Sequence, residues 1–385
     1  MMLLGIWLHT VVGYSNDGGR PYKDPHPTAI YNWTLGVIHC FRMPVFFLLA
    51  GFFGALLWER GWQQFVRNRL SRILVPFVVF WIATAPIVLN LAMYAATLRP
   101  AVASPVRRGG LLANLHPMHL WFLEYLLVLY AIAFVVVKSL EATATVRPQV
   151  LSSLNGWFRA LLRSSIRPVI FAIPSAFILM LMRNAVLEDP PGFVPVPRIV
   201  AAYAVPFFFG WILYLNRDML DTLRVHAWRD LLMAALLVAG WMIFIQPVQD
   251  LPGNRTWVIP ARAVAISLLM WLLAFGLRGV FLRYFNTGNP AMRYLADGSY
   301  WIYLMHMVVV MGLQIALARV AVDAAFKVPV VVVAASVLLV LSYDVMVRST
   351  WIGALLNGRR YPRWFATEAP VNVSSTARTS LDSAS

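Results

Sequence analysis

The sequence predicts an all-α, polytopic membrane protein with about ten transmembrane helices. Of the 385 residues, 60% are hydrophobic and 12% are charged, whereas a soluble fold carries about 25% charged residues. The apolar residues form long runs separated by short polar clusters, which is typical of membrane spans. The net charge of +16 comes from basic residues at the ends of these runs, where topology determinants occur. No basic stripe or recognition motif is present, so nucleic acid is not expected as a partner.

The apolar segments have lengths near the ~20 residues that a helix needs to cross hydrocarbon. The predicted spans are approximately 1–15, 31–57, 73–97, 119–138, 168–187, 198–216, 230–248, 258–277, 299–318 and 328–347. The stretches 111–117 and 189–197 are predicted loops because of their Pro, Gly and Asn content. We therefore expect a transmembrane domain over 1–350 and a cytoplasmic, largely disordered tail over 351–385, since 366–385 has no periodic apolar face.

The distribution of Lys and Arg predicts the orientation of these spans. One set of alternate loops holds 20 basic residues and the opposite set holds 11. The richer set is 58–72, 138–167, 217–229, 278–293 and 348–385. Because the basic side of a membrane protein faces the cytoplasm, ten spans place both termini there.

The first segment offers only about a dozen apolar residues before the polar stretch 15–19. It lacks a basic leader and a cleavage site, so we expect a first helix that is cut short and not a signal peptide. This helix carries His9. An imidazole suits general-base catalysis near neutral pH, although a structural hydrogen bond to a backbone carbonyl explains a buried histidine equally well.

The second segment carries two ionisable residues, His39 and Arg42, which lie three positions apart on one helix face. A charge at bilayer depth costs roughly 2.5–3.5 kcal/mol, so Arg42 must face a partner or a wet cavity. The candidate partners are Glu124 and Asp344. Otherwise Arg42 holds an anionic or carbonyl group of a substrate. His39 has the same two alternatives as His9: a structural hydrogen bond, here to a neighbouring helix, or a role as a general base.

The third segment begins after Arg69 and Arg72, which the helical spacing places on one face. They are either positive-inside anchors or a fork for the phosphate oxygens of a nucleotide, close to a helix N-terminus.

The fourth and ninth segments add further polar candidates. His119 and Trp121 open the fourth span, and either orient a sugar hydroxyl or belong to an interfacial aromatic belt. His306 lies in the ninth span, and its side chain either packs between helices or belongs to the functional site. His116 and His119 have no evident third ligand nearby, so no metal site is predicted. The signatures of soluble hydrolases, ATPases and metalloproteases are missing.

These features, in order, resemble the acyltransferase family 3 integral membrane proteins, and within them the branch that succinylates periplasmic glucans. The resemblance rests on the first-helix histidine, Phe41 to Gly51, the Arg-x-x-Arg pair before Pro76, the block 119–123 and the block 303–306. It implies a bacterial inner-membrane enzyme that transfers an acetyl or succinyl group from cytoplasmic acyl-CoA to a hydroxyl of an envelope carbohydrate. It also implies that His9 is catalytic and that Arg69 and Arg72 bind the donor. The family's basic residue eleven positions before this histidine would precede Met1.

The predicted mechanism follows from these assignments. His9 acts as the base, Arg42 stabilises the oxyanion, and Glu124 sets the charge around Arg42. Trp121, His39, His119 and His306 contact the substrate, and no metal is expected. The alternative is a transporter or flippase for a lipid-linked or polyanionic sugar, in which Arg42 and His39 line a path.

Overall fold

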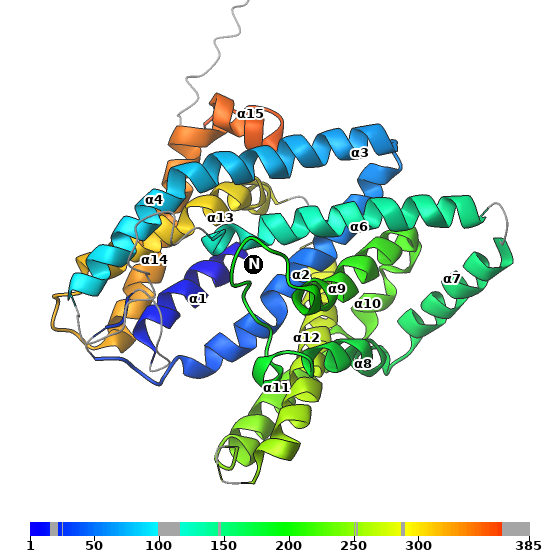
Figure 1. The fold of residues 1–385 in the computed structure, drawn as a ribbon, viewed down its shortest axis with the longest axis horizontal. Helices are drawn as coiled ribbons and strands as arrows, with labels where there is room; N and C mark the ends of the chain where they lie inside the picture. The colour runs from blue at the N-terminus through cyan, green and yellow to red at the C-terminus, as the bar shows by residue number, and fades with distance from the viewer. Residues whose placement is uncertain are drawn as a thin grey trace, which may run out of the picture.

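The computed structural model describes residues 1–15, 22–24, 26–98, 116–144, 148–249, 251, 253–285 and 289–363. Every regular element in these ranges is helical, which confirms the predicted all-α class (Figure 1). Eight helical stretches of the described chain are long and apolar enough to cross a membrane. Up to nine qualify if one bent pair forms a single span, and a shorter apolar helix stands at the N-terminus. The predicted number of about ten spans agrees with this arrangement.

The long helical stretches are α2 (Asn32–Trp58), α3 (Trp62–Arg69) continued by a π-helical turn (Leu70–Leu74) and α4 (Val75–Leu98), a short turn (Met118–Leu120) with α6 (Trp121–Ala144), α9 (Pro197–Leu215), α11 (Ala227–Gly240) with a π-helical turn (Trp241–Ile245), α12 (Arg255–Tyr284), α13 (Pro290–Ala316), and α14 (Ala324–Ser342) with a π-helical turn (Tyr343–Arg348). The shorter helices are α1 (Met2–Tyr14), α7 (Pro148–Arg163), α8 (Arg167–Leu179), α10 (Thr222–Val225) and α15 (Trp351–Asn357).

The predicted span 168–187 is wrong in its second half. Helix α8 ends at Leu179 and makes an angle of 114° with α7. The polar pair Arg183 and Asn184 interrupts the apolar run, and Asn184 adopts a left-handed conformation with φ 57°. The chain from 186 to 196 then forms a loop, which includes the predicted loop 189–197 up to the start of α9.

The C-terminal boundary also differs in detail from the prediction. Helix α15 lies in the predicted tail, yet it packs against α13 and the turn Leu70–Leu74. The segment after it is held by Arg348, whose Nε donates to the carbonyl of Pro362 at 2.7 Å. The predicted disordered stretch 366–385 and residues 111–115 of the first predicted loop lie outside the described residues.

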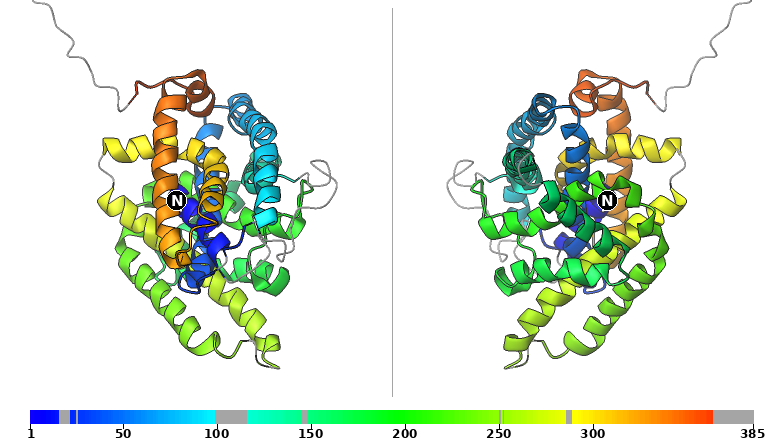
Figure 2. Two further views of the ribbon diagram at one scale, coloured as in Figure 1. Left: turned by 90° about the vertical axis from the view of Figure 1, so that its left-hand side faces the viewer. Right: turned by 90° about the vertical axis from the view of Figure 1, so that its right-hand side faces the viewer.

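Helices α2 and α9 cross with their backbones in direct contact. A Cβ atom on Gly51 would overlap the carbonyl oxygen of Phe207, and one on Gly210 would overlap the carbonyl oxygen of Leu48. Small residues at such crossings are the usual way for membrane helices to gain van der Waals contact, because lipid supplies no hydrophobic drive between them. By contrast, α11 and α12 form a hairpin that projects from the other helices, and α11 is largely exposed (Figures 1 and 2).

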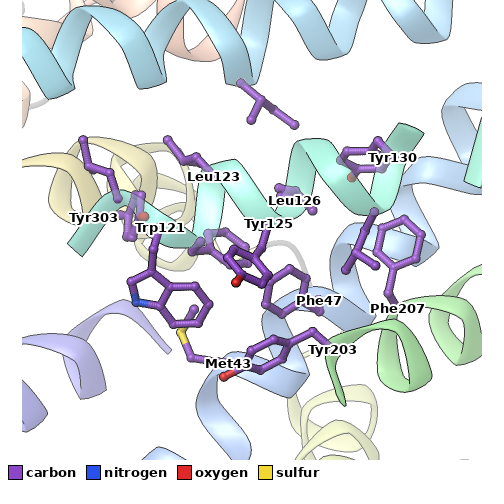
Figure 3. Packing of buried hydrophobic residues seen from close by; sticks show 14 of the residues in the cluster. Met43, Phe47, Trp121, Leu123, Tyr125, Leu126, Tyr130, Tyr203, Phe207 and Tyr303 are labelled. Carbon is purple, nitrogen blue, oxygen red and sulfur yellow. The ribbon is translucent and has the colours of Figure 1, made fainter. Parts of the chain in front are cut away.

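An aromatic cluster fills the space beside this crossing (Figure 3). Phe47 of α2 stacks on Tyr203 of α9 with ring centroids 4.5 Å apart, and Trp121 of α6 lies 5.5 Å from the Tyr203 ring. The cluster joins α2, α6 and α9 into one unit. Trp121 is also part of the cavity wall described below.

We expect Gly210→Ala to destabilise the protein, because the added methyl group must push α9 away from α2. Overpacking of this kind costs about 1–3 kcal/mol. Thermal unfolding of the detergent-solubilised variant, followed by tryptophan fluorescence, measures the effect. Gly240→Ala is the matched control, since nothing lies within 4 Å of a Cβ at that helical glycine. Equal unfolding temperatures for the two variants would contradict the prediction.

Candidate active site

A cavity of about 700 Å³ lies among α1, α2, α4, α6, α13 and the loop before α9. The predicted site residues that line it are His9, His39, Arg42, His119, Trp121 and His306. They come from segments up to almost 300 positions apart in sequence, so the fold gathers the intramembrane polar residues around one space. Glu124, Arg69 and Arg72 are not among the lining residues.

His39 holds the loop that covers one side of the cavity. Its Nε2 lies 2.8 Å from the carbonyl oxygen of Leu187. Because a carbonyl only accepts, Nε2 must carry the proton and donate. The same loop is fastened to α9 by Glu188, which pairs with Arg198 at 2.7 Å. Hydrogen bonding from Arg198 lowers the pKa of Glu188, so this carboxylate is ionised at neutral pH.

His119 and Tyr303 join the start of α6 to α13 by reciprocal hydrogen bonds. The hydroxyl of Tyr303 donates to the carbonyl of His119 at 2.9 Å, and Nε2 of His119 donates to the carbonyl of Leu304 at 3.0 Å. The turn they hold contains Met118 at φ 51°, a left-handed conformation that non-glycine residues rarely adopt. The two bonds therefore fix a strained turn at the edge of the cavity.

His306 lies between two other imidazoles. Its ring centroid is 5.0 Å from that of His9 and 5.3 Å from that of His119. Nδ1 of His306 is 2.6 Å from the carbonyl oxygen of Tyr303. Nδ1 therefore carries a proton, and Nε2 of a neutral ring is a hydrogen-bond acceptor. His306 therefore contacts both other rings, and within the described chain no group of three or more His, Cys, Asp or Glu residues could hold a metal ion.

Arg42 reaches from α2 across the cavity to α1. A Cβ on Gly5 would lie 2.8 Å from Nη1 of Arg42, so the guanidinium packs against a bare stretch of α1 backbone. The groups that interact with it electrostatically are Asp189, Tyr203 and Tyr303. Its Nε is buried, and no hydrogen-bond partner for it is found in the described ranges. The side chain is thus a cationic donor on the cavity wall.

The predicted partners of Arg42 are corrected by this arrangement. Among the described residues no ion pair joins Arg42 to Glu124 or Asp344. The cavity receives Trp121 and Phe122 from α6 but not Glu124, and Asp344 accepts a hydrogen bond from Tyr294 at 3.4 Å. The carboxylate near Arg42 instead comes from a loop, as Asp189.

Arg69 and Arg72 contact different parts of the fold. Arg69 donates to the carbonyl of Phe53 at 3.1 Å and lies over the ring of Tyr130. Arg72 donates to the last carbonyls of α15, including that of Leu355 at 2.9 Å. Arg69 directly precedes the π-helical turn Leu70–Leu74 and Arg72 lies within it, so the spacing between the two side chains is not that of an α-helix. They do not form the shared-face fork that α-helical spacing predicts.

Gln314 was missed by the sequence analysis. It lies in α13, is 2% exposed, and its Nε2 donates to the carbonyl of Thr10 at 3.0 Å and to that of His9 at 3.4 Å. A Cβ on Gly13 would collide with the same amide group. Gln314 therefore fixes α1 at the turn that carries His9. Its position as a polar residue within an apolar span is the signal that was available in the sequence.

Comparisons with known proteins give one consistent family. The family described as "Acyltransferase domain" matches residues 1–347. Proteins named "Glucans biosynthesis protein C" from Salmonella paratyphi B and Salmonella schwarzengrund are each 24% identical over 324 residues, which is 80% of this chain and 78% of theirs. No solved structure matches the chain.

We expect His39→Leu to release the loop before α9, because leucine cannot donate to the carbonyl of Leu187. His39→Gln is the matched variant, since its amide retains a donor near the position of Nε2. Hydrogen–deuterium exchange of peptides covering 183–196 should be faster in His39→Leu and close to wild type in His39→Gln. Identical exchange in all three proteins would show that His39 does not hold the loop.

Proposed function

Because the chain belongs to the acyltransferase family whose model matches residues 1–347, we propose that it moves an acyl group from acyl-CoA to a hydroxyl of an envelope glucan. The cavity is the proposed reaction site. The observation that carries this proposal is the gathering of His9, a general-base candidate, and Arg42, a fixed cation, on the wall of one intramembrane space.

In the proposed reaction His9 takes the proton of the acceptor hydroxyl while the oxygen attacks the thioester carbonyl carbon. The carbonyl oxygen becomes an oxyanion, and the guanidinium of Arg42 stabilises its charge. The carbon–sulfur bond then breaks, and the departing thiolate takes the proton back from His9. The products are an ester and free CoA. Base catalysis of this kind contributes about 10²–10⁴-fold, and one oxyanion donor contributes about 10²–10³-fold.

The donor is proposed to be acetyl-CoA or succinyl-CoA, with its phosphates near Arg69 and Arg72. Both guanidinium groups bond to backbone carbonyls, so phosphate oxygens would have to replace or join these partners. A contact between α13 and this end of the fold supports the assignment. Tyr300 donates to the carbonyl of Arg72 at 2.9 Å, and Tyr303, one turn further along α13, lines the cavity.

The acceptor is proposed to be a glucan, which is supported by the name of the curated relatives. Trp121 offers an aromatic face and His119 and His39 offer ring nitrogens along the wall, a combination that suits the apolar faces and hydroxyl groups of a sugar. A bacterial inner-membrane location is proposed because the curated relatives come from Salmonella, and the basic-residue asymmetry supports placing both termini in the cytoplasm. We assign Glu124 no role in the reaction, because it does not line the cavity.

The test is transfer of radiolabelled acyl groups by purified protein in proteoliposomes. Labelled acetyl-CoA and succinyl-CoA are supplied separately with a linear β-linked gluco-oligosaccharide, and the sugar is examined by mass spectrometry. Label in an ester on the oligosaccharide is the expected result and identifies the acyl group. Movement of unmodified sugar across the bilayer, without transfer from either donor, would replace the enzyme with a transporter.

We expect His9→Ala to lower the turnover by about 10²–10⁴-fold, since the base that activates the hydroxyl is lost. Expression, membrane insertion and the unfolding temperature should be unchanged, because alanine is a good helix former and leaves the cavity larger. The labelled-transfer assay measures the loss. Normal turnover by this variant would remove His9 from the reaction.

We expect Gly13→Ala to reduce turnover by roughly 10–100-fold, because the new methyl group displaces the amide of Gln314 and shifts the turn that carries His9. Gln314→Leu should have a similar effect, and the double variant should lose no more than either single variant. Gly312→Ala is the control. Gly312 also lies in α13, and nothing lies within 4 Å of a Cβ at that position. Additive losses in the double variant would show that the two residues act separately.

A further inference from the structure

His306 carries a buried nitrogen that the proposed reaction does not yet use. The side chain is 5% exposed, and its Nε2 is buried without a hydrogen-bond partner in the described part of the chain. The bond from Nδ1 to the carbonyl of Tyr303 makes this Nε2 an acceptor in the neutral ring. A buried acceptor that is left unpaired is unfavourable unless another state of the protein supplies a donor.

The ring beside His306 that can change its charge in the proposed reaction is that of His9, with the two centroids 5.0 Å apart and the ring planes tilted by 48°. This separation allows ring atoms of the two imidazoles to approach hydrogen-bond distance. His119 also packs edge-on against His306, with an interplanar angle of 89°, and is itself fixed by the carbonyl of Leu304. The orientation of His306 is therefore set by α13 and by His119.

The other charged and titratable groups around His9 already have defined neighbours. From α2, His39 bonds to Leu187 and Arg42 interacts with Asp189, the one carboxylate among the lining residues of the described chain. From α13, Tyr303 donates to the carbonyl of His119. From α14, Lys327 pairs with Asp24 at 2.7 Å. From the segment before α6, Nδ1 of His116 accepts from the amide of Met118.

We propose that His306 is a positioning residue for His9, and that its Nε2 accepts a hydrogen bond from the N–H of His9 as His9 becomes protonated. This inference rests on the proposed function. The imidazolium that forms on His9 has two N–H groups. One has just received the proton of the acceptor hydroxyl and later returns it to the thiolate, and the other donates to His306. His306 takes up no proton, so the balance of the reaction is unchanged.

The arrangement is that of a catalytic base oriented by a third group, with a neutral imidazole in place of a carboxylate. Inside a membrane a neutral acceptor is energetically favourable, because a second charged side chain beside Arg42 would need its own partner. It also fixes which nitrogen of His9 faces the acceptor, since the nitrogen that donates to His306 cannot be the base.

The test compares His306→Met with His306→Gln. Methionine fills the space without an acceptor at the position of Nε2, whereas the amide oxygen of glutamine restores one. We expect His306→Met to lower kcat by roughly 10–100-fold with little change in the acceptor KM. His306→Gln should recover most of this loss. In a His9→Ala background, His306→Met should cause no further loss.

The pH profile separates positioning from a purely structural role. Loss of the acceptor makes protonation of His9 less favourable, so the acidic limb of kcat/KM should move to lower pH in His306→Met and return in His306→Gln. Gly312→Ala should keep the wild-type profile. An unchanged kcat and an unchanged acidic limb in His306→Met would overturn the proposal.

A measurement that does not need turnover keeps the two proposals distinguishable. Nitrogen-15 NMR of histidine-labelled protein in detergent should show His306 protonated at Nδ1, and should show His9 titrating at lower pH in His306→Met. A His306 ring protonated at Nε2, or a His9 titration that the substitution leaves unchanged, would overturn the pairing. Failure of the wild type to transfer from either donor would remove the proposed function, while the NMR result would still decide the pairing.

Discussion

Backbone carbonyl groups hold three histidines and two arginines of this membrane domain, and the rest of the site depends on this constraint. His39, His119 and His306 each place one ring nitrogen against a carbonyl oxygen. Arg69 and Arg72 do the same with their guanidinium groups. In hydrocarbon a polar group without a partner costs several kcal/mol, and a helix offers a second lone pair on each carbonyl without losing its own bonds. The nitrogens that make these bonds are thereby satisfied without carboxylate partners.

This form of pairing also determines chemistry. A carboxylate partner would leave an imidazole free to carry charge, whereas a carbonyl fixes one nitrogen as the donor and leaves the other as an acceptor. The buried acceptors at His119 and His306 follow directly from these bonds. Positive charge is concentrated in Arg42, which lies on the cavity wall and interacts with a carboxylate from a loop. The cavity wall thus combines a cationic group with neutral imidazoles.

The sequence predicted the class of fold and six of the residues that line the cavity. The energetic penalty for polar groups in lipid singles out four of them, His9, His39, Arg42 and His306. It did not predict the partner of Arg42, since Asp189 belongs to a loop and loop positions carry no such penalty. The predicted fork of Arg69 and Arg72 is not formed, because the prediction requires α-helical spacing and Arg72 lies within a π-helical turn. The end of α8 was misplaced because hydropathy continues past Leu179 while the backbone does not. Gln314 was open to the same reasoning as the histidines and was overlooked because it is uncharged.

The glycines explain how these polar groups reach one another. Gly5 gives the guanidinium of Arg42 direct access to the α1 backbone, and Gly13 gives the amide of Gln314 access to the carbonyl of Thr10. Both glycines lie on α1, a helix of 13 residues that packs against α2, α13 and α14. Its position is set from both sides, by α2 through Arg42 and by α13 through Gln314. Since His9 lies between the two glycines, the contacts that locate α1 are also the contacts that locate the proposed base.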